Sequence, residues 1–422
     1  MTSAPQVDLD PAAEDISTWH ADGPISGWAC PQWRGVVDVF VSNFERGEVG
    51  ASFSVVANGY RVVDIWGGLQ SPEGEPWHQD TLSVFYSCSK IISALVVHHL
   101  IEHGNLSLDA PLRDYWPELK AAQMGGTARM ALCHSLGLPA IASRLKEGAY
   151  NDHAYMVSKL EAQSPFWTPG TRVGYHPITF GFILGELVRR VSGKTLGQYF
   201  QDHFALPLGL DLFVGLPIEK YGRVAPSLGY RPLPSDPVKH VARASQEIGS
   251  IQNLWLFNSG QWRLDAINSA EGLAAEIPAA NGVGNAHSLA ALMAVFLDAQ
   301  RMSTIGLSQQ TVSRLEAVCA ASQRDATLLA NTRFSCGMMK SIDNRLDQAA
   351  DSFIMGRQAF GHVGMGGSFG MCDREAGFAA AYVMNQQGPG ILLNARGQDL
   401  LNACYQVAKF ETLSEGGWER TP

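Results

Sequence analysis

The alternation of apolar and polar residues predicts regular structure at both ends of the chain. Residues 31–48 carry an apolar stripe at helical spacing, and the following run ASFSVVANGYRVVDIWGG has two β-rich halves around Asn58-Gly59. This pattern predicts a helix that leads into a hairpin with a tight turn. Near the C-terminus, GSFGMCD and GFAAAYVMN flank the turn-like residues 373–377, and residues 399–410 have a helical pattern. We therefore expect one antiparallel sheet that contains strands from both ends.

The middle of the chain has a mostly helical pattern. Apolar residues at helical spacing predict helices over residues 89–103, 178–191 and 287–299, and Gly104 and Gly193 follow the first two as helix terminators. The fold class is therefore α+β, with a helical lobe inserted into an α/β lobe.

Residues 226–263 fit no regular element in this scheme. They are rich in Pro, Gly and Asn, yet they also carry aromatic side chains, and such a segment is typical of a long loop that forms the wall of a binding site. We expect residues 1–422 to form a single catalytic unit. Its parts are an α/β lobe of residues 22–84 and 332–422, and a helical lobe with substrate-binding loops of residues 85–331.

Composition narrows the class of protein. The chain has 422 residues, of which 46% are hydrophobic, so it can bury a large core. The formal net charge is -9, and no basic cluster is longer than Arg189-Arg190, which argues against a nucleic-acid partner. The acidic N-terminus lacks a signal-peptide pattern, and no segment has eighteen uninterrupted apolar residues. A cytoplasmic location without a membrane partner is the expectation.

The cysteines are odd in number and widely scattered, and no C-x-x-C motif occurs. We expect neither a disulfide framework nor a cysteine-rich zinc site, but reduced thiols that serve as packing residues. The seven are Cys30, Cys88, Cys133, Cys319, Cys336, Cys372 and Cys404.

The pattern S-x-x-K occurs as Ser87/Lys90 and as Ser143/Lys146. Ser87 follows the β-like run LSVFY and opens an apolar helix, where unpaired N–H groups and the helix dipole favour a developing negative charge. Lys90 shares a helix face with Ser87, so its amine is placed to accept the serine proton. A simple N-cap serine would explain Ser87 equally well. The second pair lies among charged residues and is typical of a solvated turn.

Two further patterns compete with this one. His99, Glu102 and His103 spell the zinc-peptidase motif H-x-x-E-H, but their helix is apolar almost all round and no third carboxylate ligand stands out downstream. Histidines near a helix C-terminus are favourable without a metal, so we expect no metal and no cofactor. Residues 366–370 spell G-x-S-x-G, but the last histidine precedes Ser368, whereas the α/β-hydrolase order requires it to follow. Ser368 is interpreted as part of a glycine-rich strand edge.

Further motifs accompany Ser87 in order along the chain. They are FWTPGTRVGYHPITFGFILGELVRRVSGKTL around Tyr175 and FGHVGMGGSFG around His362, with LDAPLRDYWPEL and LCHSLGLPA between Ser87 and Tyr175. Together they resemble the serine β-lactamase-like superfamily, in particular the esterase branch related to class C β-lactamases, the family VIII carboxylesterases. The resemblance spans residues 33–385. It implies a β-lactamase/penicillin-binding-protein-like fold, in which terminal helices flank an antiparallel sheet and a mostly helical lobe is inserted.

The resemblance also implies a set of roles. Ser87 would be the nucleophile, Lys90 its neighbouring base or proton shuttle, and Tyr175 the group that deprotonates Ser87 and protonates the leaving alcohol. The oxyanion hole would consist of the N–H groups of Ser87 and Met365. Lysine and tyrosine both titrate near pH 10 when unperturbed, but mutual packing in a partly dry site can make either of them a competent base.

Two departures from the β-lactamase pattern bear on the substrate. Tyr175-His176-Pro177 stands where β-lactamases have Tyr-x-Asn, so the side-chain amide that holds an acylamide group is absent. His362-Val363-Gly364 stands where they have Lys-Thr-Gly, which replaces a fixed positive charge by a side chain that is often neutral but can donate one hydrogen bond. Both changes favour uncharged esters over anionic β-lactams. The expected substrate-binding residues are His362, Gly364, His176, Trp255 and Phe257.

The expected activity is hydrolysis of a small-molecule ester through a Ser87 acyl-enzyme. An amidase or peptidase, an acyltransferase and a weak β-lactamase of the same fold remain alternatives. A non-catalytic binding protein and a zinc hydrolase are the alternatives outside it. The sequence predicts neither the oligomeric state nor the natural acyl group.

Overall fold

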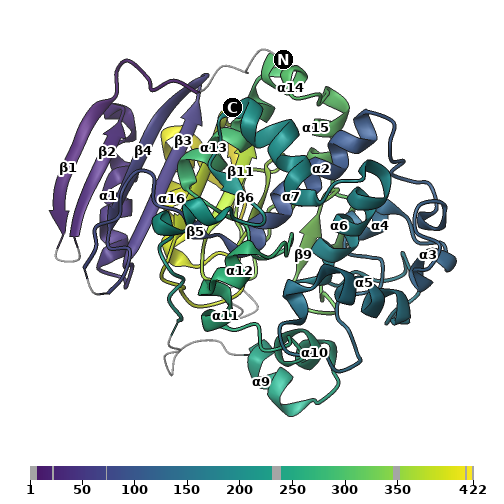
Figure 1. The fold of residues 1–422 in the computed structure, drawn as a ribbon. Helices are drawn as coiled ribbons and strands as arrows, with labels where there is room; N and C mark the ends of the chain where they lie inside the picture. The colour runs from purple at the N-terminus through teal and green to yellow at the C-terminus, as the bar shows by residue number, and fades with distance from the viewer. Residues whose placement is uncertain are drawn as a thin grey trace.

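The computed structural model describes residues 7–20, 23–72, 74–230, 239–345, 352–413 and 416–420. A seven-stranded sheet runs through it in the order β1-β2-β4-β3-β12-β11-β10, and all neighbouring strands are antiparallel. The N-terminal and C-terminal parts of the chain meet where β3 pairs with β12 (Figure 1), as predicted. The strands are β1 (Glu14–His20), β2 (Gly23–Ala29), β3 (Gly50–Ala57), β4 (Tyr60–Gly68), β10 (Phe360–Val363), β11 (Phe369–Asp373) and β12 (Phe378–Met384).

The predicted hairpin turn joins β3 and β4. Asn58 and Gly59 both have positive φ, at 52° and 83°, which is the backbone conformation of the two-residue turns that match strand twist. Ala57 pairs with Tyr60 directly across this turn. The β1–β2 hairpin, in contrast, is an element that the sequence pattern did not predict.

Helices cover both faces of the sheet, so the central strands are buried on both sides. Alternate residues of β12 enter two different hydrophobic cores: Ala380 and Tyr382 pack with the terminal helices, and Ala379 and Ala381 with the helical lobe. The terminal helices α1 (Arg34–Phe44) and α16 (Ala395–Val407) contact each other. On the opposite face α13 (Ala286–Ala294) contacts β3, β11 and β12.

The helical lobe lies to the right of the sheet in Figure 1 and is centred on α2 (Ser89–Glu102). This helix is buried on every side as far as Leu100, and it packs on α6 (Thr179–Ser192). The helices predicted over residues 89–103 and 178–191 are therefore confirmed, and α13 begins the one predicted at residue 287. The other helices are α3 (Lys120–Gln123), α4 (Ala128–Leu132), α5 (His153–Ala162), α7 (Leu196–Phe200), α8 (Leu206–Leu208), α11 (Leu264–Asn268), α12 (Ala270–Ala274), α14 (Ala299–Thr304) and α15 (Gln309–Glu316).

The prediction of a long loop over residues 226–263 is wrong in part. The segment contains α9 (Lys239–Gln246) and α10 (Ile251–Phe257), and residues 231–238 lie outside the described residues. Ser250 caps α10 by accepting the N–H of Asn253 at 3.1 Å. Short strands complete the fold: β5 (Ser83–Val84), β6 (Leu212–Phe213), β7 (Val283–Gly284), β8 (Ala320–Ser322), β9 (Thr332–Phe334), β13 (Phe410–Thr412) and β14 (Trp418–Arg420).

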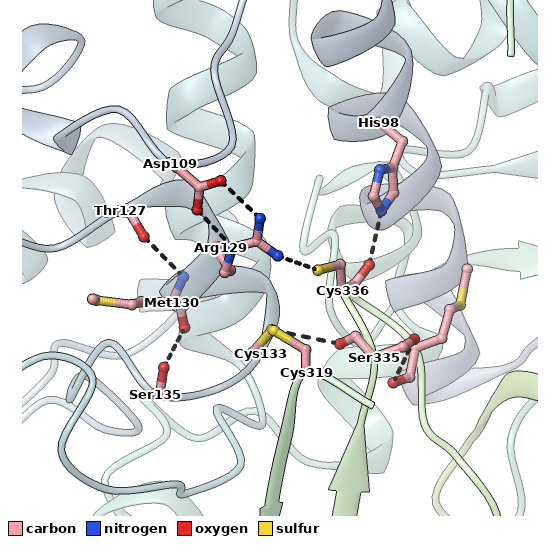
Figure 2. The surroundings of a disulfide bond; sticks show 11 residues. His98, Asp109, Thr127, Arg129, Met130, Cys133, Ser135, Cys319, Ser335 and Cys336 are labelled. Carbon is pink, nitrogen blue, oxygen red and sulfur yellow. Dashed lines mark hydrogen bonds and ion pairs between the residues drawn. A yellow bond between two sulfur atoms is a disulfide. The ribbon is translucent and has the colours of Figure 1, made fainter. Parts of the chain in front are cut away.

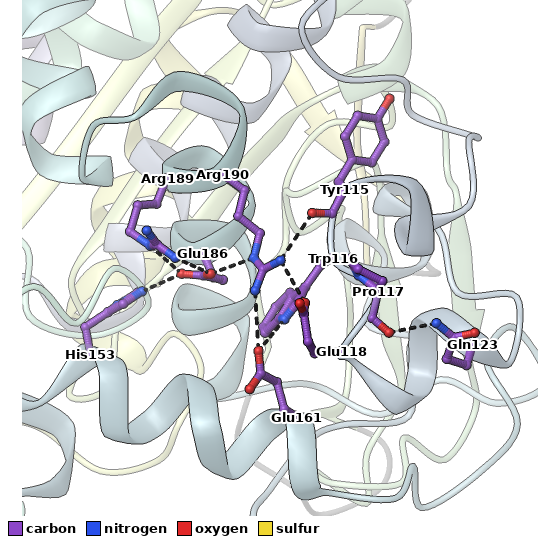
Figure 3. A network of polar contacts seen from close by, with 10 residues as sticks. All are labelled: Tyr115, Trp116, Pro117, Glu118, Gln123, His153, Glu161, Glu186, Arg189 and Arg190. Atoms are coloured by element: carbon purple, nitrogen blue, oxygen red, sulfur yellow. Dashed lines mark hydrogen bonds and ion pairs between the residues drawn. The ribbon is translucent and has the colours of Figure 1, made fainter.

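A buried carboxylate organises the outer part of the helical lobe (Figure 3). Glu186 on α6 accepts hydrogen bonds from Arg189 at 2.7 Å and from Arg190 at 2.6 Å, and His153 of α5 lies 3.5 Å away. Arg190 continues to Glu118 at 2.8 Å. Burial alone would raise the pKa of Glu186, but the hydrogen bonds from His153 and the two arginines outweigh it and lower that pKa to about 2.

One disulfide bond links Cys133 at the end of α4 to Cys319 just before β8 (Figure 2). The expectation that all seven cysteines are reduced is therefore wrong for this pair. The two residues are 186 positions apart, and only the tertiary fold brings them together. The other five cysteines are free and buried, as predicted. None of the described helices is long and apolar enough to cross a membrane.

Candidate active site

Ser87 lies in a 3-10 turn, Tyr86–Cys88, between β5 and the buried helix α2. Tyr86 has a φ of 47°, which is rare for a bulky residue and costs about 1–3 kcal/mol. Ser89 stabilises this turn, because its hydroxyl donates to the Tyr86 carbonyl and accepts the Gly282 N–H at 2.7 Å. Ser87 thus lies in a turn that the two hydrogen bonds of Ser89 brace.

Ser368 supports the same turn from the sheet. Its buried hydroxyl donates to the carbonyl of Phe85 at 3.0 Å, so it serves as a structural hydrogen-bond donor, in line with the interpretation of G-x-S-x-G as a strand edge. A Cβ atom at Gly364 would collide with both the Ser368 hydroxyl and the Phe85 carbonyl. Glycine at position 364 therefore lets the end of β10 approach the turn that carries Ser87.

Lys90 is fully buried one helical turn after Ser87. Its Nζ lies 3.2 Å from Ser87 Oγ, 2.7 Å from the Pro177 carbonyl and 2.9 Å from the Ala279 carbonyl. Burial lowers the pKa of Lys90 well below its ordinary value. A neutral amine has two N–H groups, which the two carbonyls accept, so its lone pair faces the Ser87 hydroxyl.

Tyr175 completes this group. Its side chain is hydrogen-bonded to Ser87, and its ring centroid lies 4.8 Å from Lys90 Nζ. Burial raises the pKa of Tyr175, and the hydrogen bond to Ser87 only partly opposes this. The structure thus brings the three predicted residues Ser87, Lys90 and Tyr175 together, and it favours a neutral lysine beside a neutral phenol.

Two residues that the sequence did not single out hold Tyr175 in place. Asp325 accepts the backbone N–H of Tyr175 on both carboxylate oxygens, at 3.0 and 2.9 Å. Phe334 of β9 stacks on the Tyr175 ring with centroids 6.1 Å apart and an interplanar angle of 6°. Both residues come from the β8–β9 hairpin, 150 or more residues away in the chain.

His176 lies beneath the site. Its Nε2 accepts the Leu138 N–H at 3.0 Å, so the ring is neutral and Nδ1 donates to the Gly174 carbonyl at 2.6 Å. Burial lowers the pKa of His176 to about 3. Since both ring nitrogens have partners, His176 has no group left for a substrate. Its backbone N–H is bound by His134 Nδ1 at 3.1 Å, and the His134 ring packs 4.8 Å from that of Tyr175.

His362 is buried on β10, with its ring 6.0 Å from that of Tyr175. Nδ1 lies 2.7 Å from the carbonyl of Val363, so it carries the hydrogen and Nε2 carries a lone pair. Nε2 has no hydrogen-bond partner within the part of the chain that the structure describes. Burial and the nearby Lys90 lower the pKa of His362 to about 3. The unpaired ring nitrogen is therefore an acceptor, whereas the sequence suggested a donor.

A cavity of about 430 Å³ adjoins Met365, the residue after the His-Val-Gly motif. Trp255 and Trp262 contribute to its lining, together with Tyr150 and Ile178. Phe257, also predicted to bind substrate, is 56% exposed and is not among the lining residues. Over the described residues, the N–H of Met365 donates no hydrogen bond, which leaves it free to bind an oxyanion.

The competing patterns lie elsewhere. Ser143 is exposed, and Lys146 binds Asp152 at 2.6 Å instead of the serine. Glu102 accepts hydrogen bonds from the Ser308 and Thr311 hydroxyls, at 2.9 and 2.6 Å. Its carboxylate is therefore occupied by α15 and the residue before it.

Comparisons with known proteins agree with this fold. The family model named Beta-lactamase matches residues 33–402, and the chain belongs to this family. It is 31% identical to "Esterase/beta-lactamase LipL" of Mycobacterium tuberculosis over 398 residues, which cover 90% of this chain and 88% of that protein.

Solved structures point the same way. The crystal structure of a family VIII carboxylesterase has a TM-score of 0.79 at 32% identity, covering 91% of this chain and 99% of that one. EstA from Arthrobacter nitroguajacolicus Rue61a has a TM-score of 0.77 at 26% identity, covering 93% and 98%. The predicted α+β fold and the resemblance to the esterase branch are therefore confirmed.

Proposed function

We propose that the protein is a serine carboxylesterase that cleaves small uncharged esters through a Ser87 acyl-enzyme. The observation that carries this proposal is the arrangement at Lys90. Its two N–H groups are accepted by the Pro177 and Ala279 carbonyls, and its lone pair faces Ser87 Oγ at 3.2 Å. An amine held in this way is a base poised for a hydroxyl proton. Esterase relatives of the same family support the choice of reaction.

Acylation follows from this arrangement. Ser87 Oγ attacks the ester carbonyl carbon while its proton moves to Lys90 Nζ, and the carbonyl oxygen becomes an oxyanion. The N–H groups of Ser87 and Met365 stabilise that charge. Tyr175 donates its hydroxyl proton to the departing alkoxide and regains a proton from Lys90. Because burial raises the pKa of Tyr175, the phenol suits the role of acid better than that of initial base.

Deacylation uses the same groups in reverse. Water attacks the acyl carbon and gives its proton to Lys90, directly or through Tyr175, and Ser87 Oγ leaves with a proton. His362 Nε2 provides an acceptor for the second hydrogen of that water, since it is buried, has no partner within the described residues and lies on the ring beside Tyr175. In the proposal His362 thus acts as a hydrogen-bond acceptor, and Gly364 lets the end of β10 lie close to the turn that carries Ser87.

The cavity supports an uncharged substrate with a bulky apolar group. Trp255, Trp262 and Ile178 present apolar surface beside the proposed oxyanion hole. His362 is neutral and replaces the lysine with which β-lactamases bind a carboxylate. Trp255 is kept as a substrate-binding residue, whereas Phe257 is directed towards solvent. A cytoplasmic location remains part of the proposal, as does the absence of a nucleic-acid partner, which the acidic charge supports.

A fluorophosphonate probe followed by peptide mapping tests the assignment. We expect one adduct on Ser87, and its loss in Ser87→Ala but not in the matched control Ser143→Ala. An adduct on Ser143 or Ser368, or none, contradicts it. Turnover of short p-nitrophenyl esters is expected to exceed that of a chromogenic cephalosporin. Preference for the cephalosporin would favour a β-lactamase. The two substrates are compared because one relative is named "Esterase/beta-lactamase".

A further inference from the structure

A free thiol, that of Cys336, lies beside the disulfide bond (Figure 2). The Sγ atoms of Cys133, Cys319 and Cys336 all lie within 4.8 Å of one another. Cys133 and Cys336 are buried and Cys319 is half-buried, so Cys319 is the member of the cluster that solvent can reach. A thiol next to a disulfide is the arrangement that permits exchange, in which a thiolate attacks a disulfide sulfur.

Positive charges near Cys336 partly offset the effect of burial on its thiol. Arg129 Nη1 lies 3.5 Å from Cys336 Sγ, and Asp109 holds the guanidinium from the other side, at 2.6 and 2.7 Å. Burial raises the pKa of Cys336, while the positive charges of Arg129 and Arg314 oppose that shift. The Cys336 backbone is fixed as well, because its carbonyl lies 2.8 Å from His98 Nε2.

We propose that Cys133, Cys319 and Cys336 form a thiol–disulfide exchange site that controls the surroundings of Tyr175. In the exchange, Cys336 loses its proton and its sulfur attacks Cys319 Sγ. The Cys133–Cys319 bond breaks, a Cys319–Cys336 bond forms, and Cys133 leaves as a thiolate that takes up a proton. One disulfide and one thiol are present before and after, so no external oxidant or reductant is needed.

The link to Tyr175 is structural. Cys133 precedes His134, whose ring packs 4.8 Å from Tyr175 and 4.5 Å from Phe334. Cys319 donates its N–H to the Phe334 carbonyl at 2.7 Å and begins the hairpin that carries Asp325. The Cys133–Cys319 bond therefore ties together two segments that contact Tyr175. A Cys319–Cys336 bond would join two residues of the same segment, around the β8–β9 hairpin. The segment of Cys133 and His134 would then no longer be covalently linked to that hairpin.

Disulfide mapping of the purified full chain tests the exchange independently of any activity. The protein is held in glutathione buffer at about pH 7 and about pH 9, where more thiolate forms, then acid-quenched, alkylated and digested without reduction. We expect a Cys319–Cys336 peptide with alkylated Cys133, formed faster at the higher pH. Cys336→Ser should yield only Cys133–Cys319, and the control Cys30→Ser should behave as wild type. Persistence of Cys133–Cys319 alone, or three free thiols under oxidised glutathione, overturns the proposal.

Kinetics tests the control of Tyr175, and this arm rests on the proposed esterase activity. Cys133→Ser leaves Cys319 and Cys336 to pair. We expect its kcat/KM for p-nitrophenyl acetate to fall about tenfold, since small displacements of a catalytic group are costly, while Cys336→Ser keeps wild-type kinetics. If a Cys133→Ser protein with a mapped Cys319–Cys336 bond keeps the wild-type kcat/KM, the disulfide state does not affect Tyr175 and this part of the proposal is contradicted. Mapping of the same sample distinguishes that result from failure of the esterase proposal.

Discussion

Asp325 receives the backbone N–H of Tyr175 on both of its carboxylate oxygens. The same carboxylate accepts the N–H groups of Thr327 and Leu328 and the hydroxyl of Thr332, so one buried side chain joins the β8–β9 hairpin to the segment that carries the proposed acid. The position of Tyr175 thus depends on a residue that binds its backbone N–H.

Replacing Asp325 tests this dependence. In Asp325→Asn, a carboxylate that accepts hydrogen bonds on two oxygens is replaced by an amide that can accept on only one. We expect kcat for a p-nitrophenyl ester to fall about 10–100-fold with a small change in KM, because Tyr175 shifts relative to Ser87. Thr332→Val is the matched control, since it removes one donor to Asp325 and leaves the Tyr175 contact intact. An unchanged kcat in Asp325→Asn would contradict a positioning role.

The proposed acid and base can be removed one at a time. Tyr175→Phe and Lys90→Ala should each lower kcat by about two to four orders of magnitude, since each removes a proton-transfer group. Lys146→Ala, in the second S-x-x-K pattern, should leave kcat unchanged because Lys146 binds Asp152. Circular dichroism and thermal melts check that the variants are folded. A variant at Lys90 or Tyr175 that keeps wild-type kcat would refute the role of that residue.

The pH profile reports on Lys90. In the proposed mechanism its neutral form is the base, and burial holds its pKa well below the ordinary lysine value. Protonation therefore inactivates the enzyme on the acid side, and kcat/KM should be level at neutral pH and fall as the pH drops through that lowered pKa. Stopped-flow or steady-state measurement from about pH 4 to about pH 10 checks this. A kcat/KM that climbs steadily to pH 10 would show a lysine with an ordinary pKa.

Glu186 should make stability depend on acid pH. Its pKa in the folded chain, about 2, lies below the unfolded value, so its contribution is present above about pH 4.3 and is lost as the pH falls towards 2. Glu186→Gln should lower the free energy of unfolding by about 2–3 kcal/mol at neutral pH. Urea unfolding at several pH values measures this. Glu118→Gln, at the exposed end of the same network, should change stability little.

The cavity makes a prediction about the acyl or alcohol group. Trp255→Ala removes apolar surface beside Met365, worth about 1.5–3 kcal/mol when fully buried, so kcat/KM for a p-nitrophenyl hexanoate should fall about tenfold. The acetate ester should be affected less. Phe257→Ala is the matched control, because its side chain is 56% exposed and does not line the cavity. Equal losses in both variants would place the substrate elsewhere.

Much of the fold is predictable because burial leaves a periodic trace in the sequence. The helices α2 and α6 and the β3–β4 turn follow directly from apolar spacing and from Asn58-Gly59. The β2 strand, GPISGWA, escaped notice because glycine and proline interrupt its β-rich residues. The short helix α10 was hidden by the Pro- and Asn-rich residues around it, and its cap at Ser250 is a weak signal by itself.

In the candidate site, too, residues in local motifs could be predicted, and residues placed by long-range contacts could not. Ser87, Lys90 and Tyr175 could be predicted because their motifs occur in a fixed order, but Asp325 and Phe334 lie in SQRDATLLANTRF, which has no motif. Their importance comes from contacts across 150 residues or more, and no local pattern encodes those contacts. The Cys133–Cys319 bond was missed for the same reason, with 186 residues between its ends.

The pairing of β3 with β12 has a consequence for synthesis of the protein. Ser87 emerges from the ribosome before residues 360–363, which form the edge strand beside its turn, and that strand joins the sheet through β11 and β12. Contacts of such high sequence separation form late. The nascent chain therefore carries Ser87, the proposed nucleophile, in an unfinished site, and the proposed acylation has to wait until β10, β11 and β12 have been synthesised and have paired.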